Sequence, residues 1–186
     1  MELPLATNPD FFHPRPGTPE LACDVLIIGR AHEDRIAPVK ALSERFRVHI
    51  YGEEWDRHGL PNRSPLYGDD LLCALNSARM AVIFCRTPAG HSIPKIAVFD
   101  FLAAGALVAT ERTPALSRYF EYGHEIIGFN DLNELIDSVS YFLRHPDEAE
   151  KIRWAGRRRV LEEHTWAKLW PRLLACMPPK ERSLAY

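Results

Sequence analysis

Two arginines follow a short apolar run and could bind a phosphorylated ligand. The run Asp24–Ile28 ends at Gly29, and Arg30 and Arg35 come next. Gly29 lets the backbone turn sharply, and Asp34 can cap the helix expected after it. Two guanidinium groups beside a helix N-terminus can clamp a diphosphate through paired hydrogen bonds. On spacing alone, two solvated surface arginines explain the pattern equally well.

A second polar segment lies directly before a predicted buried helix, Pro94–Ala104. It contains Gly90, His91, Ser92 and Lys95. Free backbone N–H groups at a helix N-terminus attract anions, and Ser92 and Lys95 can add donors. His91 can bond a phosphate or a sugar hydroxyl. The alternative is that Ser92 caps the helix and His91 is solvated.

Asp100 is the single acidic residue within this predicted helix. A carboxylate in an apolar helix must be paired, hydrogen-bonded or turned to solvent. One use is to accept hydrogen bonds from both hydroxyls of a ribose. The alternative is a structural pair with a nearby arginine or amide.

Other polar groups in the chain indicate no second chemistry. The run Arg157–Arg159 is flanked by glutamates and is typical of a solvated helix face, so we expect no nucleic-acid binding. The eight histidines lack ligand spacing, so no metal site is expected. No cysteine pair has CxxC spacing, and free thiols are expected at Cys23, Cys73, Cys85 and Cys176.

Short apolar runs alternate with helical patterns along the chain, which predicts an α/β fold. Strands are expected at 24–28, 47–51, 80–85, 107–110 and 125–129. Helices are expected at 34–46, 68–78, 94–104 and 114–120, from Asp131 and Pro146, and after the cap residue Thr165. In the last helix, the side chains expected to face the core are Trp166, Leu169, Trp170, Leu173 and Leu174. Such alternation predicts a Rossmann-like parallel sheet flanked by helices, with ligands at the carboxyl ends of its strands.

Length and charge indicate one globular domain. The 186 residues divide into a proline-rich arm (1–22), a domain (23–178) and a tail (179–186), and the formal net charge is −2. No apolar run reaches the roughly 20 residues of a membrane span, and no signal peptide is evident. We therefore expect a cytoplasmic protein.

Three segments resemble the carboxyl-terminal domain of GT-B glycosyltransferases, in particular the group of spore-maturation-type glycosyltransferase-like proteins. They are GHSIPKIAVFDFLAAGALVATE from Gly90, LSRYFEYGHE from Leu116, and the stretch from His145-Pro146 to His164-Thr165. The arm segment 3–14 is similar to the linker that joins the two halves of such enzymes. This likeness implies a single GT-B half-domain that begins where the first half would end.

The resemblance implies a nucleotide-diphosphate sugar, with UDP sugars as the default, held without a metal or other cofactor. It implies that Arg30 faces the diphosphate, that loop 90–92 contacts phosphate or sugar, and that Asp100 replaces the glutamate that holds the ribose. Two further positions depart from the family pattern, because Ser92 and Ala97 stand where a glutamate and an arginine are usual. Lys95 can substitute for that arginine from one side.

Two classes of function follow. The first is the nucleotide-sugar-binding half of a glycosyltransferase, working with an acceptor half on another chain through an exposed apolar face near the arm and last helix. The second is a non-catalytic nucleotide-binding or interaction module, in which a homodimer covers that face. Transfer by this chain alone is not expected, because transfer needs donor and acceptor held in line and water excluded.

Overall fold

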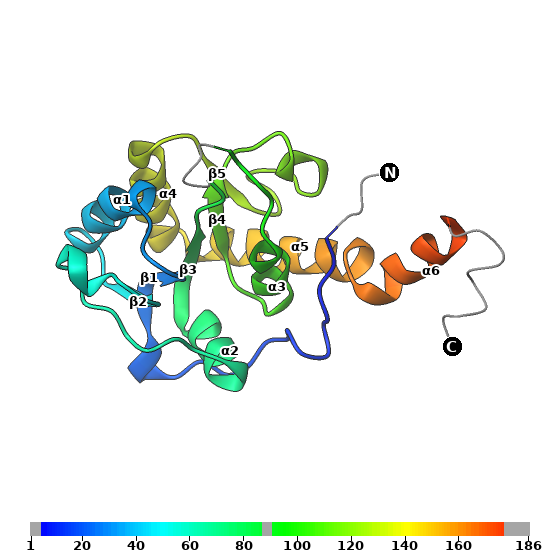
Figure 1. Cartoon of the computed structure of the whole chain (residues 1–186), viewed down its shortest axis with the longest axis horizontal. Coiled ribbons are helices and arrows are strands. Elements are labelled where there is room, and N and C mark those ends of the chain that lie inside the picture. The colour runs from blue at the N-terminus through cyan, green and yellow to red at the C-terminus, as the bar shows by residue number, and fades with distance from the viewer. Residues whose placement is uncertain (1–4, 87–90, 177–186) are drawn as a thin grey trace.

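The computed structural model describes residues 5–86 and 91–176 and shows one parallel sheet between layers of helices (Figure 1). Its strand order is β2-β1-β3-β4-β5. The strands are β1 (Cys23–Ile28), β2 (Val48–Tyr51), β3 (Ala78–Ile83), β4 (Val108–Glu111) and β5 (Ile127–Phe129). The α-helices are α1 (Glu33–Ser43), α2 (Gly68–Ser77), α3 (Ile96–Ala103), α4 (Leu132–Arg144), α5 (Pro146–Glu163) and α6 (Trp166–Cys176). Short 3-10 turns are η1 (Pro19–Leu21), η2 (Asp56–His58) and η3 (Leu116–Arg118).

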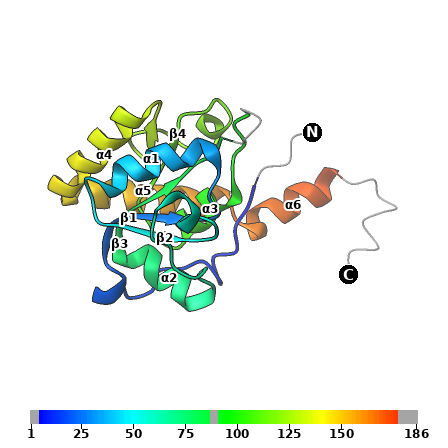
Figure 2. The same ribbon diagram turned by 60° about the vertical axis from the view of Figure 1, so that its left-hand side comes forward.

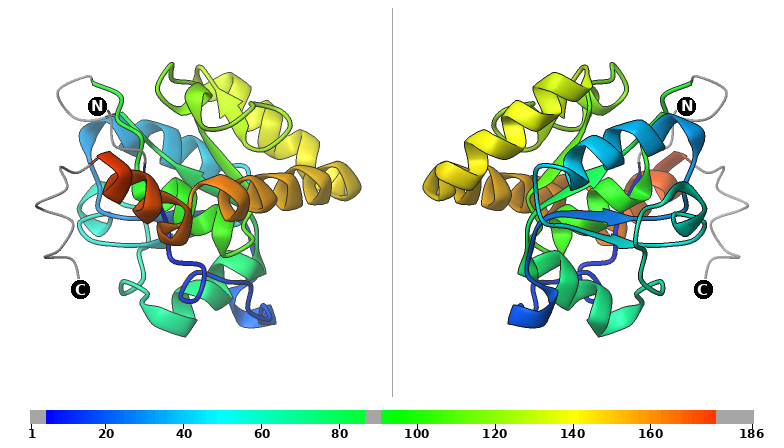
Figure 3. Two further views of the ribbon diagram at one scale, coloured as in Figure 1. Left: turned by 90° about the vertical axis from the view of Figure 1, so that its right-hand side faces the viewer. Right: turned by 90° about the vertical axis from the view of Figure 1, so that its left-hand side faces the viewer.

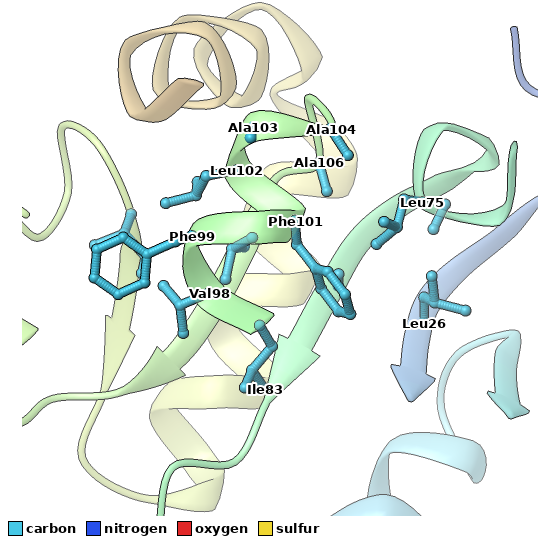
Figure 4. Close-up of a cluster of buried hydrophobic side chains, with 14 of the residues drawn as sticks. Leu26, Leu75, Ile83, Val98, Phe99, Phe101, Leu102, Ala103, Ala104 and Ala106 are labelled. Carbon is cyan, nitrogen blue, oxygen red and sulfur yellow. The ribbon is translucent and has the colours of Figure 1, made fainter. Parts of the chain in front are cut away.

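The sheet separates two apolar cores. Alternate residues of each strand point to opposite faces, so Leu26 packs with α2 and α3, whereas Val25 and Ile27 pack with α1 and α4. In the first core, side chains from α3 such as Val98 and Phe101 face the strands (Figure 4). Burial on both faces explains why the strands are nearly continuous apolar runs, and the predicted α/β sheet is confirmed.

Helix α3 begins later than predicted. Pro94 precedes it, and Lys95 is its N-cap residue, with an extended backbone at φ −98° and ψ 140°. The interpretation of Ser92 as the cap is therefore wrong, because Ser92 pairs with Arg86 in an antiparallel bridge instead. A residue before proline avoids helical geometry, which explains why Ile93 stays outside the helix, and the extended backbone of Lys95 sets the start at Ile96.

The predicted capping signal at the start of α4 is confirmed. The carboxylate of Asp131 accepts a hydrogen bond from the backbone N–H of Glu134 at 2.9 Å. The Glu134 carboxylate in turn accepts from the backbone N–H of Asn130 at 2.8 Å, one residue earlier than in the standard capping box. These bonds fix the chain as it leaves β5.

Helix α5 joins the two cores, with α4 lying close along part of it (Figure 3). Ile152 packs into the core beneath α4, whereas Val160 packs into the core around α3. Between them, Gly156 lies against the backbone of Glu125, and a Cβ added there would be 2.1 Å from the Glu125 carbonyl oxygen. Only glycine permits this approach of helix to loop.

Helix α6 differs from its prediction. It projects from the layered body at the end of α5 (Figures 1 and 2). Thr165 caps it as predicted, since its Oγ1 accepts from the backbone N–H of Lys168 at 3.3 Å. Of the residues predicted to face inward, only Leu169 is buried within the described chain, while Trp166 and Trp170 are 52% and 51% exposed.

We predict that Gly156→Ala destabilises the fold by roughly 2 kcal/mol, because the added methyl group forces α5 away from Glu125. In thermal unfolding, Tm should fall by about 5 °C. The control is Arg158→Ala on an exposed position of the same helix, which should leave Tm nearly unchanged. Equal Tm values for the two variants would contradict the close packing of α5.

Candidate functional site

The carboxyl ends of all five strands meet at one edge of the sheet. The chain order reverses between β1 and β3, which are neighbours in the sheet although β2 lies between them in sequence. Ligands of open parallel sheets bind in the crevice at such a switch point. The loops that border it here follow β1 at Gly29 and β3 at Phe84.

Arg35 lies near this edge, and its guanidinium has a nitrogen that makes no hydrogen bond to the described residues. It is 9% exposed, and its Nη1 donates to the carbonyl oxygen of Arg30 at 3.4 Å. Its Nε is buried without a hydrogen-bond partner among the described residues, as is Oδ1 of Asp34. A buried guanidinium donor without a partner is costly, and because this Nε is closed to solvent, an anion would reach it only after a shift of the Arg35 side chain.

Lys95 lies after β3, on the other side of the switch point, close enough to Arg35 to feel its charge. Its Nζ donates to the carbonyl oxygen of Phe84 at 2.5 Å. Burial lowers the pKa of Lys95, and the positive charge of Arg35 lowers it further. Glu111 lies close by and accepts from the backbone N–H of Cys85 at 2.5 Å. The two cations repel each other, and the nearby carboxylates of Glu111 and Asp34 offset part of that repulsion.

Arg30, in contrast, is drawn toward β2. Its Nε donates to Glu54 at 2.5 Å, and the same carboxylate accepts from Arg57 at 2.7 Å. This hydrogen bond lowers the pKa of Glu54. Glu54 has a left-handed backbone, with φ 67°, and the buried Trp55 beside it donates from its indole to the Gly29 carbonyl at 2.7 Å. The backbone of Arg30 therefore lies beside Arg35, while its guanidinium pairs with Glu54.

The polar segment before α3 closes onto the end of β3. Ser92 and Arg86 form the antiparallel bridge, and the backbone N–H of Ile93 donates to the Cys85 carbonyl at 3.1 Å. His91 and Ser92 are exposed, while Gly90 lies outside the described residues. Ser92 and His91 are thus accessible at the same edge as Lys95.

Asp100, on the second turn of α3, already has a partner. Its Oδ1 accepts a 2.6 Å hydrogen bond from the hydroxyl of Thr7, in the arm. Burial raises the pKa of Asp100 to about 6, and the Thr7 bond opposes that rise. The expected arginine or amide partner is replaced by a hydroxyl.

Comparison with known proteins identifies the family of the chain. The family model described as glycosyl transferase-like matches residues 30–175. The chain belongs to this glycosyl transferase-like family. No curated protein sequence matches it.

Solved structures agree on the fold of this glycosyl transferase-like domain. The C-terminal domain of the group 1 glycosyl transferase LpcC from Francisella tularensis matches with TM-score 0.55 and 11% identity, covering 86% of this chain and 99% of that one. Sucrose-phosphate synthase from Thermosynechococcus elongatus matches with TM-score 0.66 and 15% identity, covering 94% and 53%. Anabaena Alr3699/HepE, solved with UDP and glucose, matches with TM-score 0.68 and 9% identity, covering 91% and 54%. The chain therefore has the fold of a GT-B half-domain and spans about half the length of the latter two proteins.

Two hollows of the glycosyl transferase-like domain lie at opposite edges of the sheet. One, of about 130 Å³, lies at the carboxyl edge between α1 and α4, with Asp34, Arg86 and Glu111 in its wall. The other, of about 200 Å³, lies at the amino edge near Asn76 and Arg153, where the guanidinium is fully used by Gly105, Glu150 and Asn76. The first hollow is lined by Asp34, Glu111 and Asp131 but by neither Arg35 nor Lys95, so the carboxyl edge is preferred for its place at the switch point and not for this hollow.

Sequence reasoning missed Glu54 and Thr7. No local sequence pattern identifies either of them, because each contacts its partner through the order of strands or the path of the arm.

Within the described residues no group of three or more His, Cys, Asp or Glu side chains is placed to hold a metal ion. None of the described helices is long and apolar enough to cross a membrane.

We predict that Asp100→Asn becomes more stabilising, relative to the wild type, as pH rises. The folded-state pKa of about 6 lies above the ordinary 3.8, so stability from this group is fully present below pH about 4 and is lost as pH passes 6. Urea unfolding between pH 4 and 7.5 should show the Asn variant gaining about 1 kcal/mol on the wild type, allowing for solvent screening. The exposed Asp137→Asn is the control, and parallel profiles for Asp100→Asn and wild type would refute the burial of this carboxylate.

Proposed function

We propose that this domain binds the nucleotide-sugar donor of a glycosyl transfer, with the diphosphate at the switch point between β1 and β3. The observation that carries the proposal is the buried Arg35 in the first turn of the helix after β1, whose guanidinium makes one hydrogen bond at 3.4 Å and leaves its Nε unpartnered among the described residues, close to Lys95. Paired donors of this kind match the oxygens of a diphosphate. The family membership and the UDP found with glucose in Alr3699/HepE support a UDP sugar as the first ligand to test.

The remaining predicted site residues fit around this diphosphate. His91 and Ser92 are exposed beside Lys95, where a sugar or phosphate oxygen would lie. Asp100 is five residues beyond Lys95, about 7.5 Å along the helix axis, which is within reach of a nucleoside whose diphosphate sits at Lys95. Arg30 adds a further donor when its exposed side chain leaves Glu54.

In transfer, the bond between the sugar and the diphosphate breaks, and negative charge develops on the leaving diphosphate. Arg35 and Lys95 would stabilise that charge in a site where burial strengthens electrostatic interactions. Such a site needs no metal, and we propose a metal-independent mechanism. The acceptor and the group that deprotonates it would come from an acceptor domain outside these 186 residues.

Helix α6 supports the involvement of a further domain. Trp166 and Trp170 form an exposed apolar pair one helical turn apart, and Phe11 in the arm is also exposed. Aromatic side chains in exposed pairs are typical of interaction surfaces. We propose that the acceptor half packs on this face.

A non-catalytic nucleotide-binding or interaction module is the second candidate. Two observations favour it. Ala97 offers no donor where the related pattern has an arginine, and Asp100 is occupied by Thr7. Nucleotide binding without any transfer, even beside a cognate acceptor domain, would select this alternative.

We predict that the purified chain binds UDP or a UDP sugar and that Arg35→Met weakens binding by roughly 10- to 100-fold, the value of a charge-assisted hydrogen bond. Methionine fills the buried volume but removes the donors. Calorimetry with UDP, GDP and ADP measures the effect. Arg158→Met, on the exposed side of α5, is the matched control and should bind as the wild type does. If Arg35→Met retained wild-type affinity, the diphosphate would not lie at Arg35.

We further predict that the chain on its own transfers no sugar from UDP-glucose to added acceptors, although it binds the donor. An open half-site neither aligns an acceptor nor excludes water. Chromatographic detection of released UDP and of glycosylated product checks this. Turnover by the isolated chain, abolished by Arg35→Met, would show that the acceptor site lies within these residues.

A further inference from the structure

The arm is bound to the junction between α5 and α6 through its backbone. The N–H of Thr7 donates to the carbonyl of His164 at 2.9 Å, and the Thr7 carbonyl accepts from the N–H of Trp166 at 3.1 Å. Thr7 and Thr165 thus pair as parallel strands do, and both are buried. The first residue of α6 is held in place by this one residue of the arm.

The same residue reaches α3 through its side chain. The hydroxyl of Thr7 donates to Oδ1 of Asp100, 93 positions later in the chain. Thr7 is 1% exposed, so its hydroxyl has no access to water as an alternative partner. One threonine therefore connects the arm, the carboxylate of α3 and the start of α6.

Aromatic packing makes this junction one unit. The ring of His164 lies edge-on to Phe99 at 5.3 Å, and further rings, Tyr119 and Phe120, lie within 5.6 Å of it. Phe99 is the direct neighbour of Asp100 on α3. Thr7 therefore contacts both Asp100 on α3 and the backbone of His164 and Trp166 at the α5–α6 junction.

We propose that Thr7 is a latch whose hydroxyl holds Oδ1 of Asp100, so that a ribose whose two hydroxyls bind both carboxylate oxygens displaces the arm and releases the start of α6. The inference rests on the proposed donor site and adds its regulation. Donor binding and the position of the exposed Trp166–Trp170 face become coupled, because both compete for the bonds of one residue. The donor half would thereby signal its occupancy to the acceptor half.

The first test is the affinity of Thr7→Val for UDP, measured by calorimetry. Valine keeps the shape and removes the hydroxyl, so Asp100 no longer has to be released and binding should tighten roughly tenfold, the value of one such bond. Thr18→Val, in the same arm, and Thr7→Ser, which keeps the hydroxyl, should bind as the wild type does. In the Asp100→Ala background, which removes the acceptor of the Thr7 hydroxyl, the gain from Thr7→Val should disappear.

The second test is amide hydrogen exchange of Thr7 and Trp166 with and without UDP. Displacement of the arm breaks the bonds of both amides, so saturating UDP should speed their exchange in the wild type. A purely structural Thr7 would leave exchange unchanged or slowed by the ligand.

The outcomes separate the latch from the donor site. If the wild type and Thr7→Val both fail to bind UDP, GDP and ADP, the proposed function fails and the latch falls with it. If the wild type binds but Thr7→Val binds equally or more weakly, the latch is overturned and the donor site stands. Binding by Thr7→Val alone would support both.

Discussion

All five strands run in the same direction, so each connection must return across a face of the sheet, and this constraint shapes the rest of the molecule. Both faces are buried as a result, one beneath α2 and α3 and the other beneath α1 and α4. The carboxyl ends of the strands lie at one edge of the sheet, and the loops that follow them lie outside the two packed faces. Arg35 and Lys95 both lie near this edge although they are 60 positions apart in the sequence.

The same constraint explains what the sequence predicts well. A parallel strand buried on both faces is an apolar run, and its helix carries a 3.6-residue period, so both can be recognised locally. The places of Arg35 and Lys95 after recognisable strands could be predicted, whereas their part in a donor site stays a prediction. The start of α3 differs from the prediction because Lys95 has an extended backbone and is the cap in place of Ser92, and Pro94 keeps Ile93 before it out of helical geometry.

Interactions between distant segments could not be predicted in this way. Arg30 pairs with Glu54 only because β2 lies beside β1, and Asp100 pairs with Thr7 only because the arm returns to α3. The apolar period of α6 predicts a buried face but does not say what buries it, and among the described residues Leu169 alone of that face is covered. Each difference concerns a residue whose partner is set by tertiary structure.

The proposed donor site lies at the carboxyl edge of the sheet, and the proposed docking face lies on α6. The switch point supplies cations with unused hydrogen-bonding capacity, and the arm connects α3 with the base of α6. The most direct test is a crystal structure of the chain with UDP. The diphosphate should lie between Arg35 and Lys95, with the nucleoside extending along α3 toward Asp100. UDP bound at the amino edge near Arg153, or anywhere away from Arg35 and Lys95, would contradict this assignment of the donor site.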